Sequence, residues 1–289
     1  MSQRPSSKQR IPVSVIADGQ SAPPRSDSVA TEEPMETRIL LGGKRHTVAV
    51  TMRTPGADFD LAVGFLYGEG VIGSRDQVRR ISYCVDEDVD ADQRYNIINV
   101  ELAGDAEPDL HVLERHFYTS SACGVCGKAS LEAIQVRGCP APSAGPVVDP
   151  EMLYGLPDKL RQKQGLFEAT GGLHAAALFS ASGELVAVSE DVGRHNAVDK
   201  LVGRALMEGR LPLADHIVLV SGRSSFEILQ KCVAAGVPMV CSVSAPSSLA
   251  VDVAREFGVT LVGFLRGRRL NVYAGEERVV GAPVSSPAS

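Results

Sequence analysis

Two cysteines, Cys123 and Cys126, are separated by two residues within the run 120–128, which is rich in glycine and other small residues. This composition predicts an exposed loop, and the residues that follow, 128–134, predict a helix. The positive end of that helix and the ammonium group of Lys128 favour thiolate over thiol, and the thiolate is the nucleophilic form of cysteine. A second thiol at this spacing can resolve a persulfide on the first or protect it as a disulfide. The pair therefore indicates sulfur or redox chemistry.

A zinc site is the main alternative for this pair, but a strong zinc signature has a second close pair of ligands downstream. The other cysteines are scattered through the chain: Cys84, Cys139, Cys232 and Cys241. Cys232 lies on the apolar stripe of a predicted helix and Cys241 within a predicted buried strand, so both are expected in the core. A zinc deaminase has a His-x-Glu motif upstream of Pro-Cys-x-x-Cys. His174 and His195 instead follow the cysteine pair, and each has alanine at the second position after it.

Three predicted loops each leave a strand and enter a helix: 189–196, 221–225 and 242–248. In a parallel sheet these loops share one edge, which is where ligands bind in open α/β folds. Backbone N–H groups at helix N-termini favour anions, and Arg194 and Arg223 can add bidentate contacts to phosphate. Ser221 begins the second loop, and the run 266–269 after the last long strand supplies three more guanidinium groups. Together these segments predict a pocket for a phosphorylated ligand, such as a dinucleotide.

Simpler interpretations of the same residues stay open. Serine at the start of a helix is ordinary N-capping, and arginines at a strand end often form a solvated rim. His195, close in sequence to Asp191 and Asp199, fits a general acid or base and a hydrogen-bonded structural histidine equally well. The position of several such segments at one sheet edge is what favours a binding site.

The elements that must position these residues fall into two parts. Residues 36–115 predict a smaller β-rich α+β domain, with a hairpin around Gly42 and Gly43, a helix over 58–69, and strands near 81–84 and 97–102. Residues 116–280 predict a larger α/β domain in which strands and helices alternate around a mainly parallel sheet. The expected strands are 173–179, 185–188, 217–220, 239–243, 259–264 and 270–273, and the expected helices are 193–207, 224–235 and 247–257.

Composition limits the functional classes. The chain has 289 residues, 44% hydrophobic and 22% charged, with a formal net charge of -6 and no Trp. These values fit a globular protein and argue against general nucleic-acid binding. No apolar run is long enough to span a membrane, and no secretory signal is present, so a cytoplasmic protein is expected. Residues 1–35 and 281–289 lack periodicity and predict disordered tails, although 13–16 could pair with a sheet edge.

Six segments together resemble the formate dehydrogenase accessory sulfurtransferase family, FdhD. They are CGVCG, GGLH at 171–174, SEDVGRHNAVDK, SGRSSFE, SAPSSLAV and GFLRGRRLNVY, and the resemblance extends over about residues 36–280. It implies a cytoplasmic homodimer whose larger, three-layer domain resembles the cytidine-deaminase-like fold without the deaminase zinc site. It also implies a sulfurtransferase that accepts persulfide sulfur from a cysteine desulfurase. The sulfur passes to the molybdenum (or tungsten) bis(molybdopterin guanine dinucleotide) cofactor, bound as cargo for the formate dehydrogenase catalytic subunit.

The resemblance also assigns residues. Cys123 matches the family's persulfide cysteine, with Cys126 as its partner. The family's cofactor-binding stretch matches Phe264, Leu265, Arg266, Gly267, Arg268 and Arg269. Ser221, Arg223, Arg194 and His195 are added from the sheet-edge argument, and no metal ligand and no membrane or nucleic-acid partner is predicted. A non-catalytic chaperone that holds the cofactor, with cysteines that contact its metal, is the main rival, and a zinc-stabilised binding module is a third hypothesis.

Overall fold

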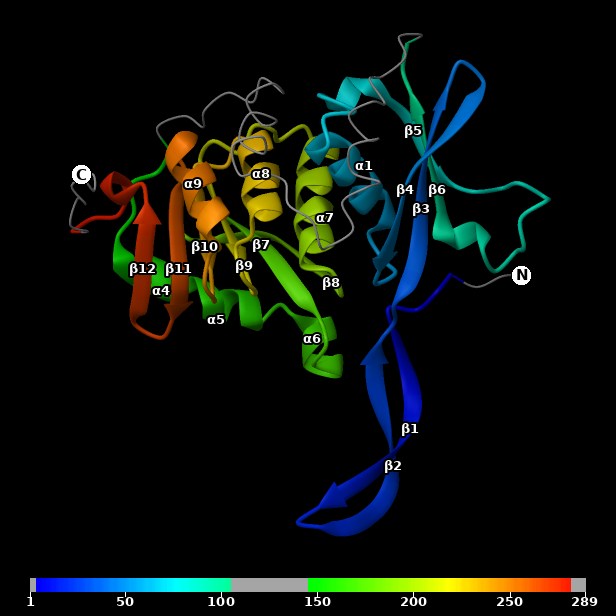
Figure 1. Ribbon diagram of the computed structural model, residues 1–289, viewed down its shortest axis with the longest axis horizontal. Coiled ribbons are helices and arrows are strands. Elements are labelled where there is room, and N and C mark those ends of the chain that lie inside the picture. The colour runs from blue at the N-terminus through cyan, green and yellow to red at the C-terminus, as the bar shows by residue number, and fades with distance from the viewer. Residues whose placement is uncertain (1–3, 105–144, 282–289) are drawn as a thin grey trace.

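The computed structural model describes residues 4–104 and 145–281, and these residues form three sheets (Figure 1). The N-terminal strands are β1 (Lys8–Ala17), β2 (Gln20–Ala30), β3 (Glu33–Leu41), β4 (Lys44–Arg53), β5 (Val78–Tyr83) and β6 (Ile97–Leu102). The C-terminal strands are β7 (His174–Ser180), β8 (Leu185–Asp191), β9 (His216–Val220), β10 (Met239–Ser242), β11 (Thr260–Arg266) and β12 (Arg269–Ala274). The helices are α1 (Asp58–Gly68), α4 (Pro150–Tyr154), α5 (Leu156–Arg161), α6 (Gly165–Thr170), α7 (Arg194–Met207), α8 (Phe226–Ala234) and α9 (Ser248–Glu256).

The C-terminal sheet is mixed, with strand order β12-β11-β10-β9-β7-β8. Strands β9, β10 and β11 are parallel as predicted, but β7 is antiparallel to both β8 and β9, and β12 is antiparallel to β11. The prediction of a mainly parallel sheet is therefore wrong. Its cause is that β7–β8 and β11–β12 are joined by short turns, and a short turn between paired strands makes an antiparallel hairpin.

The predicted common edge nevertheless exists. Because β7 is antiparallel to two neighbours, β8 and β9 run in the same direction, and β10 and β11 are parallel to β9. The C-terminal ends of β8, β9, β10 and β11 consequently lie at one edge, together with the N-terminal end of β7. The strand β8 extends to Asp191, so the first predicted loop begins later than expected.

Helices cover both faces of this sheet. Alternating strand residues such as Leu178 and Val218 pack into one apolar core with α7, α8 and α9, whereas Phe179 and Ile217 pack into another with α4 and α5. This alternation is what a sheet buried on both faces requires. The C-terminal part is therefore a mixed α/β arrangement of helix, sheet and helix layers. Its resemblance to the cytidine-deaminase-like fold stays a prediction.

The N-terminal part is rich in β-structure, as predicted. Its four-stranded sheet has the order β4-β3-β6-β5, and the predicted β3–β4 hairpin and the helix α1 are both present. The side chains of α1 and this sheet share a core that also includes Leu206 of α7. The division of the chain at residue 115 stays a prediction, and residues 105–144 lie outside the described residues.

Residues 8–30 form a hairpin instead of the predicted disordered tail. Strands β1 and β2 pair in antiparallel register around a two-residue turn at Asp18 and Gly19, and the hairpin projects from the body of the protein (Figure 1). Both turn residues have positive φ, 52° and 77°, which is the backbone of the favoured two-residue hairpin turn. The Asp-Gly pair was the available signal. Residues 13–16 pair within this hairpin and not with a larger sheet.

Helices α1 and α7 approach each other through two glycines. A Cβ atom on Gly64 would overlap the backbone carbonyl oxygen of Asp199, and one on Gly203 would overlap that of Asp60. Only glycine leaves room for two helix backbones at this separation.

We therefore expect Gly203→Ala to destabilise the protein by about 1–3 kcal/mol, because the added methyl group forces the two helices apart. The midpoint and slope of urea denaturation would measure the change. Gly165→Ala in α6 is the control, because a Cβ atom at Gly165 would have no neighbouring atom within 4 Å. Gly209→Ala would be unsuitable, because Gly209 has a positive φ of 69° that strains any other residue. An unchanged stability for Gly203→Ala would contradict the close helix contact.

No helix in residues 4–104 or 145–281 is long and apolar enough to cross a membrane.

Candidate functional site

The loops at the C-terminal edge of the sheet are joined by backbone contacts. Ser224 and Pro246 form a parallel bridge, and the backbone N–H of Ser247 donates to the carbonyl oxygen of Ser224 at 2.9 Å. The N–H of Phe264 donates to the carbonyl oxygen of Ser244 at 3.0 Å. These bonds link the segments after β9 and β10 with the end of β11 into one surface, and the sequence predicted that these segments share an edge.

The C-terminal part of β11 has a strained backbone residue, Phe264. Phe264 has φ of 52°, a left-handed conformation that is costly for a residue with a side chain. Its neighbour Gly263 packs closely, since a Cβ there would lie 2.9 Å from Tyr273 and 3.0 Å from Pro246. The β11–β12 register shifts between Gly263 and Arg266, which marks a bulge. Strain of this kind collects at ligand sites, so the bulge favours a ligand contact at the predicted stretch 264–269.

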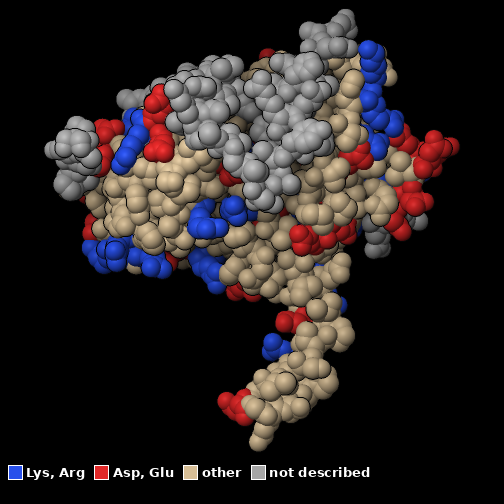
Figure 2. Space-filling model, viewed as in Figure 1, with Lys and Arg blue, Asp and Glu red and all other residues tan. Residues whose placement is uncertain are grey.

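The six residues predicted from the family resemblance do not all face solvent. Leu265 is fully buried in the core, so only its backbone is available to a ligand. Arg266, Arg268 and Arg269 are exposed at the β11–β12 turn, where Figure 2 shows basic side chains at the lower left of the molecule. The guanidinium of Arg266 lies 5.8 Å from the ring centroid of Phe264. The guanidinium of Arg268 forms an ion pair with the carboxylate of Glu151 in α4.

A second group of polar side chains surrounds His195. Its Nε2 atom lies 3.1 Å from the Ser225 hydroxyl and 3.4 Å from a carboxylate oxygen of Glu227. The hydrogen bond from His195 lowers the pKa of Glu227 to about 2, despite the opposing effect of burial. Burial lowers the pKa of His174, and the nearby Arg194 and His195 lower it further. Both contacts of His195 use the same ring nitrogen, Nε2, whereas a Ser-His-acid triad places the serine and the carboxylate on different ring nitrogens, so this cluster is not such a triad.

The Glu227 shift predicts a specific acid sensitivity. Because the folded-state pKa lies near 2, below the ordinary 4.5, the stabilisation is complete above about pH 4.5 and disappears as the pH falls toward 2. We expect Glu227→Gln to lose less stability than the wild type over that range. The difference should be below about 1 kcal/mol, since the Glu227 side chain is 53% exposed and solvent screens the pair. Urea denaturation at pH 5 and about pH 2.5 would measure it, and identical pH profiles for the two proteins would contradict the assignment.

Two buried polar atoms lie beside this cluster. The Nε atom of Arg194 and the hydroxyl of Ser224 are inaccessible and have no hydrogen-bond partner in the described part of the chain. Arg223, directly before Ser224 in the chain, is exposed. The hydroxyl of Ser221 accepts a hydrogen bond from the backbone N–H of Ala175 at 2.9 Å. The hydroxyl of Ser221 thus fixes the start of β7 against β9. The structure brings together the predicted residues of this edge, but their ligand contacts stay predictions.

A pocket of about 590 Å³ extends the edge toward α5 and α6, and its lining includes Ser221, His174, Arg161 and Phe167. The guanidinium of Arg161 lies 4.3 Å from the ring centroid of Phe167. Sequence reasoning missed these helices and therefore missed this wall. The sequence held a start signal for the preceding helix only: aspartate at the N-cap with proline next begins a helix, and the Asp149 carboxylate caps α4, whereas α5 and α6 have no side-chain cap.

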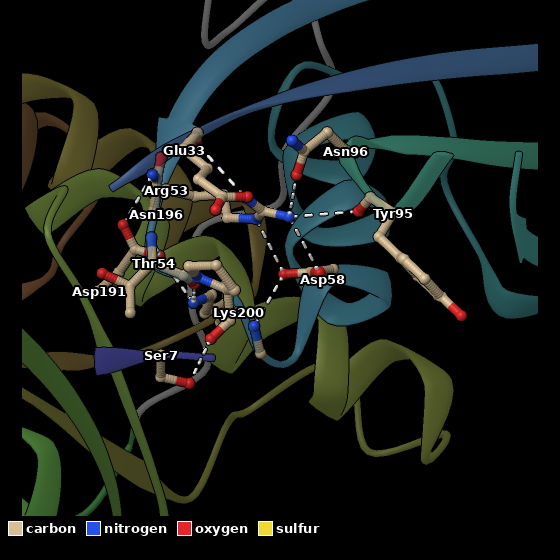
Figure 3. Close-up of polar contacts among 12 residues, drawn as sticks. Ser7, Glu33, Arg53, Thr54, Asp58, Tyr95, Asn96, Asp191, Asn196 and Lys200 are labelled. Carbon is tan, nitrogen blue, oxygen red and sulfur yellow. Dashed lines mark hydrogen bonds and ion pairs between the residues drawn. The ribbon is translucent and has the colours of Figure 1, made fainter. Parts of the chain in front are cut away.

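The motif 189–200 also has a structural role. The carboxylate of Asp191 is fully buried and forms an ion pair with Lys200 at 2.7 Å (Figure 3). It also accepts hydrogen bonds from the backbone N–H of Thr54 at 3.1 Å and the side-chain amide of Asn196 at 2.9 Å. Lys200 donates in turn to the carbonyl oxygen of Thr54 at 2.9 Å. These contacts connect the end of β4 with β8 and α7.

A second buried group adjoins the first (Figure 3). The guanidinium of Arg53 is fully buried, with its Nε atom 3.2 Å from the carboxylate of Asp58 and a second nitrogen 3.0 Å from the side-chain oxygen of Asn96. Buried charges need such partners. The sequence could not reveal them, because Arg53 and Asn96 are 43 positions apart and Thr54 and Asp191 are 137 apart.

The predicted reactive pair, Cys123 and Cys126, lies outside the described residues, as does Cys139. Cys84, Cys232 and Cys241 are buried free thiols. Burial raises the pKa of both Cys232 and Cys241 to about 12, so both remain protonated at neutral pH. The prediction that these two belong to the core is confirmed. Residues 4–104 and 145–281 contain no cluster of three metal-ligating side chains.

The sequence and fold match known proteins over most of their lengths. A sulfur carrier protein FdhD from Streptomyces avermitilis is 55% identical over 267 residues, which cover 91% of this chain and 93% of that protein. A sulfur carrier protein FdhD from Mycolicibacterium paratuberculosis is 52% identical over 257 residues, covering 88% and 93%. A crystal structure of a candidate formate dehydrogenase accessory protein from Desulfotalea psychrophila aligns with a TM-score of 0.71 at 26% identity. That alignment covers 94% of this chain and 99% of the other. The model of the FdhD/NarQ family matches residues 30–280, and the chain belongs to this family.

Proposed function

We propose that the protein is a sulfurtransferase that carries sulfur on Cys123 and delivers it to molybdenum bis(molybdopterin guanine dinucleotide) before formate dehydrogenase receives that cofactor. The observation that carries the proposal is the joined loop edge, which presents a strained Phe264 and three exposed arginines at one turn. The relatives named as sulfur carrier proteins at about half identity support the sulfur chemistry.

The sulfur reaction needs two exchanges at Cys123. In the first, its thiolate attacks the outer sulfur of a persulfide on a cysteine desulfurase; a new S–S bond forms, and the donor cysteine leaves as a thiolate. In the second, the Cys126 thiolate attacks the Sγ atom of Cys123 and forms a disulfide. The outer sulfur leaves as hydrosulfide, which would enter the metal's coordination in exchange for a ligand that the metal releases. Cys126 thereby supplies the two electrons, and a cellular thiol reductant must restore the pair.

The cofactor carries two guanine nucleotides, and its diphosphates are the groups that a cationic edge recognises. Arg266 and Arg269 are exposed and form no ion pair within the described part of the chain, so their guanidinium groups are available to phosphate. Arg194 and His195 lie at the start of α7, and Ser221 and Arg223 lie on the loop after β9. Phe264 lies in the bulge of β11 just before the arginines, and Gly267, with φ of 55°, lies in the turn between Arg266 and Arg269.

We expect Arg266→Gln to weaken the binding of guanosine diphosphate about 10-fold or more, because it removes a charge-assisted hydrogen bond worth about 1.5–3 kcal/mol. Isothermal titration calorimetry at two salt concentrations would measure the affinity. Arg255→Gln is a matched control, since Arg255 is exposed on α9 away from the turn. Equal affinities for the two variants would remove Arg266 from the proposed site.

Several partners belong to the same proposal: a cysteine desulfurase as sulfur donor, the formate dehydrogenase catalytic subunit as acceptor, and a second copy of the chain. The cytoplasm is the proposed compartment, because free thiols persist where disulfides are reduced. No nucleic-acid or membrane partner is proposed.

Intact-protein mass spectrometry tests the carrier function. The purified protein would be incubated with a cysteine desulfurase and cysteine, beside Cys123→Ala and Cys126→Ala. We expect the wild type and Cys126→Ala to gain one or more sulfur atoms that reduction removes, and Cys123→Ala to gain none. A wild type that acquires no sulfur but still binds guanosine diphosphate would favour the rival function, a cofactor chaperone. About one zinc atom per chain after purification would instead favour the zinc-stabilised binding module.

A further inference from the structure

The four-stranded sheet carries a pocket of about 740 Å³ that the proposed sulfur chemistry does not use. Its lining includes the rings of Phe59, Tyr83 and Tyr95 and the apolar side chains of Ile81 and Val85. The ring centroids of Phe59 and Tyr83 are 4.9 Å apart, and those of Tyr83 and Tyr95 are 5.2 Å apart in an edge-to-face arrangement. Such contacts hold the three rings as one rigid aromatic wall.

A guanidinium group already lies against this wall. The Cζ atom of Arg4 is 5.0 Å from the ring centroid of Tyr83 and 5.9 Å from that of Tyr95, within the range of cation–π attraction. Arg4 comes just before Pro5, and the residue before a proline favours an extended backbone. The chain therefore shows one occupant of the wall, an arginine on an extended segment.

The charge around the pocket suits a basic ligand. The loop between β5 and β6 holds four exposed acidic side chains, which form no ion pair with any described residue: Glu87, Asp88, Asp90 and Asp92. Asp86 of the same loop is already paired with Arg38 and Arg45. Arg94 is also committed, because its guanidinium donates to the carbonyl oxygens of Val89 and Glu87 and so holds the loop in place. The loop that borders the pocket through Val85 and Ala91 is thus acidic and fixed, and the charged side chain in the pocket lining itself, that of Arg94, is held by this loop.

The chain's own segment fills only part of the site. Arg4 supplies the cation, but the residues after it, Pro5, Ser6 and Ser7, have no large apolar side chain for the adjoining hollow. Val85 at the mouth of the pocket is 79% exposed, an unusual value for an apolar residue beside aromatic rings. A ligand with an arginine and neighbouring bulky apolar side chains would contact both the wall and the hollow.

We propose that this pocket binds an extended segment of a partner protein that carries an arginine flanked by apolar side chains, and that Arg4 occupies the arginine position when the partner is absent. The partner's arginine replaces that of Arg4 over Tyr83 and Tyr95, and its apolar side chains cover Phe59 and Val85. This binding site is separate from the residues of the proposed sulfur and cofactor chemistry. A negative result for the peptide site would therefore leave the proposed sulfur transfer intact, and the reverse also holds.

A fluorescein-labelled peptide, Gly-Leu-Arg-Pro-Leu-Gly, tests the site by fluorescence anisotropy on the full chain, with Gln in place of Arg as the control peptide. We expect Arg4→Gln to bind the arginine peptide about 10-fold more tightly than the wild type, because the internal competitor is gone. The glutamine peptide should bind Arg4→Gln at least about 5-fold more weakly than the arginine peptide, through loss of the cation–π contacts. Added salt should reduce this preference.

Two surface variants locate the binding. Val85→Arg places a like charge at the mouth of the pocket and should abolish binding of the arginine peptide. Val50→Arg is the matched control, since Val50 is 64% exposed on β4 of the same sheet, outside the pocket. Equal binding of both peptides to Arg4→Gln, or no binding to it at all, would overturn the proposal. A dimer that Arg4→Gln converts to a monomer in light scattering would also overturn it, because the occupant would then be a second copy of this chain.

Discussion

Cells whose only copy of this protein is Cys123→Ala should contain formate dehydrogenase with activity at least about 100-fold below normal, since removal of a nucleophile eliminates the covalent intermediate. Serine at the same position should fail equally, because a hydroxyl neither ionises near neutral pH nor forms a persulfide. The measurement is formate oxidation in extracts that contain equal amounts of the dehydrogenase polypeptide. Cys126→Ala should retain sulfur uptake but deliver it more slowly, because the resolving thiol is absent.

Cys241→Ala is the matched control for this prediction. Burial raises the pKa of Cys241 to about 12, so its thiol stays protonated and cannot act as a nucleophile at neutral pH. The variant should lose about 1 kcal/mol of stability through a small cavity and retain its formate dehydrogenase maturation. Normal activity with Cys123→Ala would remove that residue from the sulfur pathway. Loss of activity with Cys241→Ala at unchanged stability would show that thiols outside the CxxC pair take part.

The elements that the sequence predicted correctly are those set by local chemistry. The apolar spacing and closing glycines located α1, α7, α8 and α9 to within a few residues, and Gly42 and Gly43 located the β3–β4 turn. The apolar stripe with Cys232 is buried as expected. These features depend on residues within one or two turns of each other, so a single sequence is sufficient to identify them.

Pairing across long sequence distances could not be predicted in the same way. A strand that is buried on both faces has the same continuous apolar pattern whether its neighbours are parallel or antiparallel, so the alternation of strands and helices suggested a mainly parallel sheet. The hairpin β1–β2 was missed because its residues are mostly exposed and include Pro12, Pro23 and Pro24, which are uncommon within strands, although Asp18 and Gly19 fit a hairpin turn. At the candidate site, the arginine run was visible in the sequence. The left-handed backbone of Phe264 and the Ser225–Glu227 partners of His195 were not.

Asp191 illustrates how a motif residue can be assigned to structure or to function. Asp191 lies within the predicted loop 189–196 of the motif 189–200, a position that suggests a ligand contact. The structure places it at 0% exposure, with four partners from Thr54, Gly193, Asn196 and Lys200. A carboxylate with every lone pair occupied has no capacity left for a ligand. Its role is to hold β4, β8 and α7 together beneath the site.

Asp191→Ala should therefore destabilise the protein by about 3–5 kcal/mol, because it leaves the ammonium group of Lys200 buried without its counter-ion. Urea denaturation followed by circular dichroism would measure the loss, since the chain has no Trp to report by fluorescence. The double variant Asp191→Ala/Lys200→Met should recover part of the stability, because the unpaired charge is then absent. Glu184→Ala, which breaks the exposed pair with Lys159, should cost less than about 1 kcal/mol.

The same series separates support of the site from contact with the cofactor. If Asp191 acts only through packing, the double variant should regain affinity for guanosine diphosphate in proportion to its regained stability, because the edge of the sheet is restored. If Asp191 touches the ligand, affinity should stay low in both variants although stability recovers in the second. An Asp191→Ala protein that unfolds at the wild-type urea concentration but has lost nucleotide affinity would contradict the structural role. The carboxylate would then have to be released from Lys200 to reach the ligand.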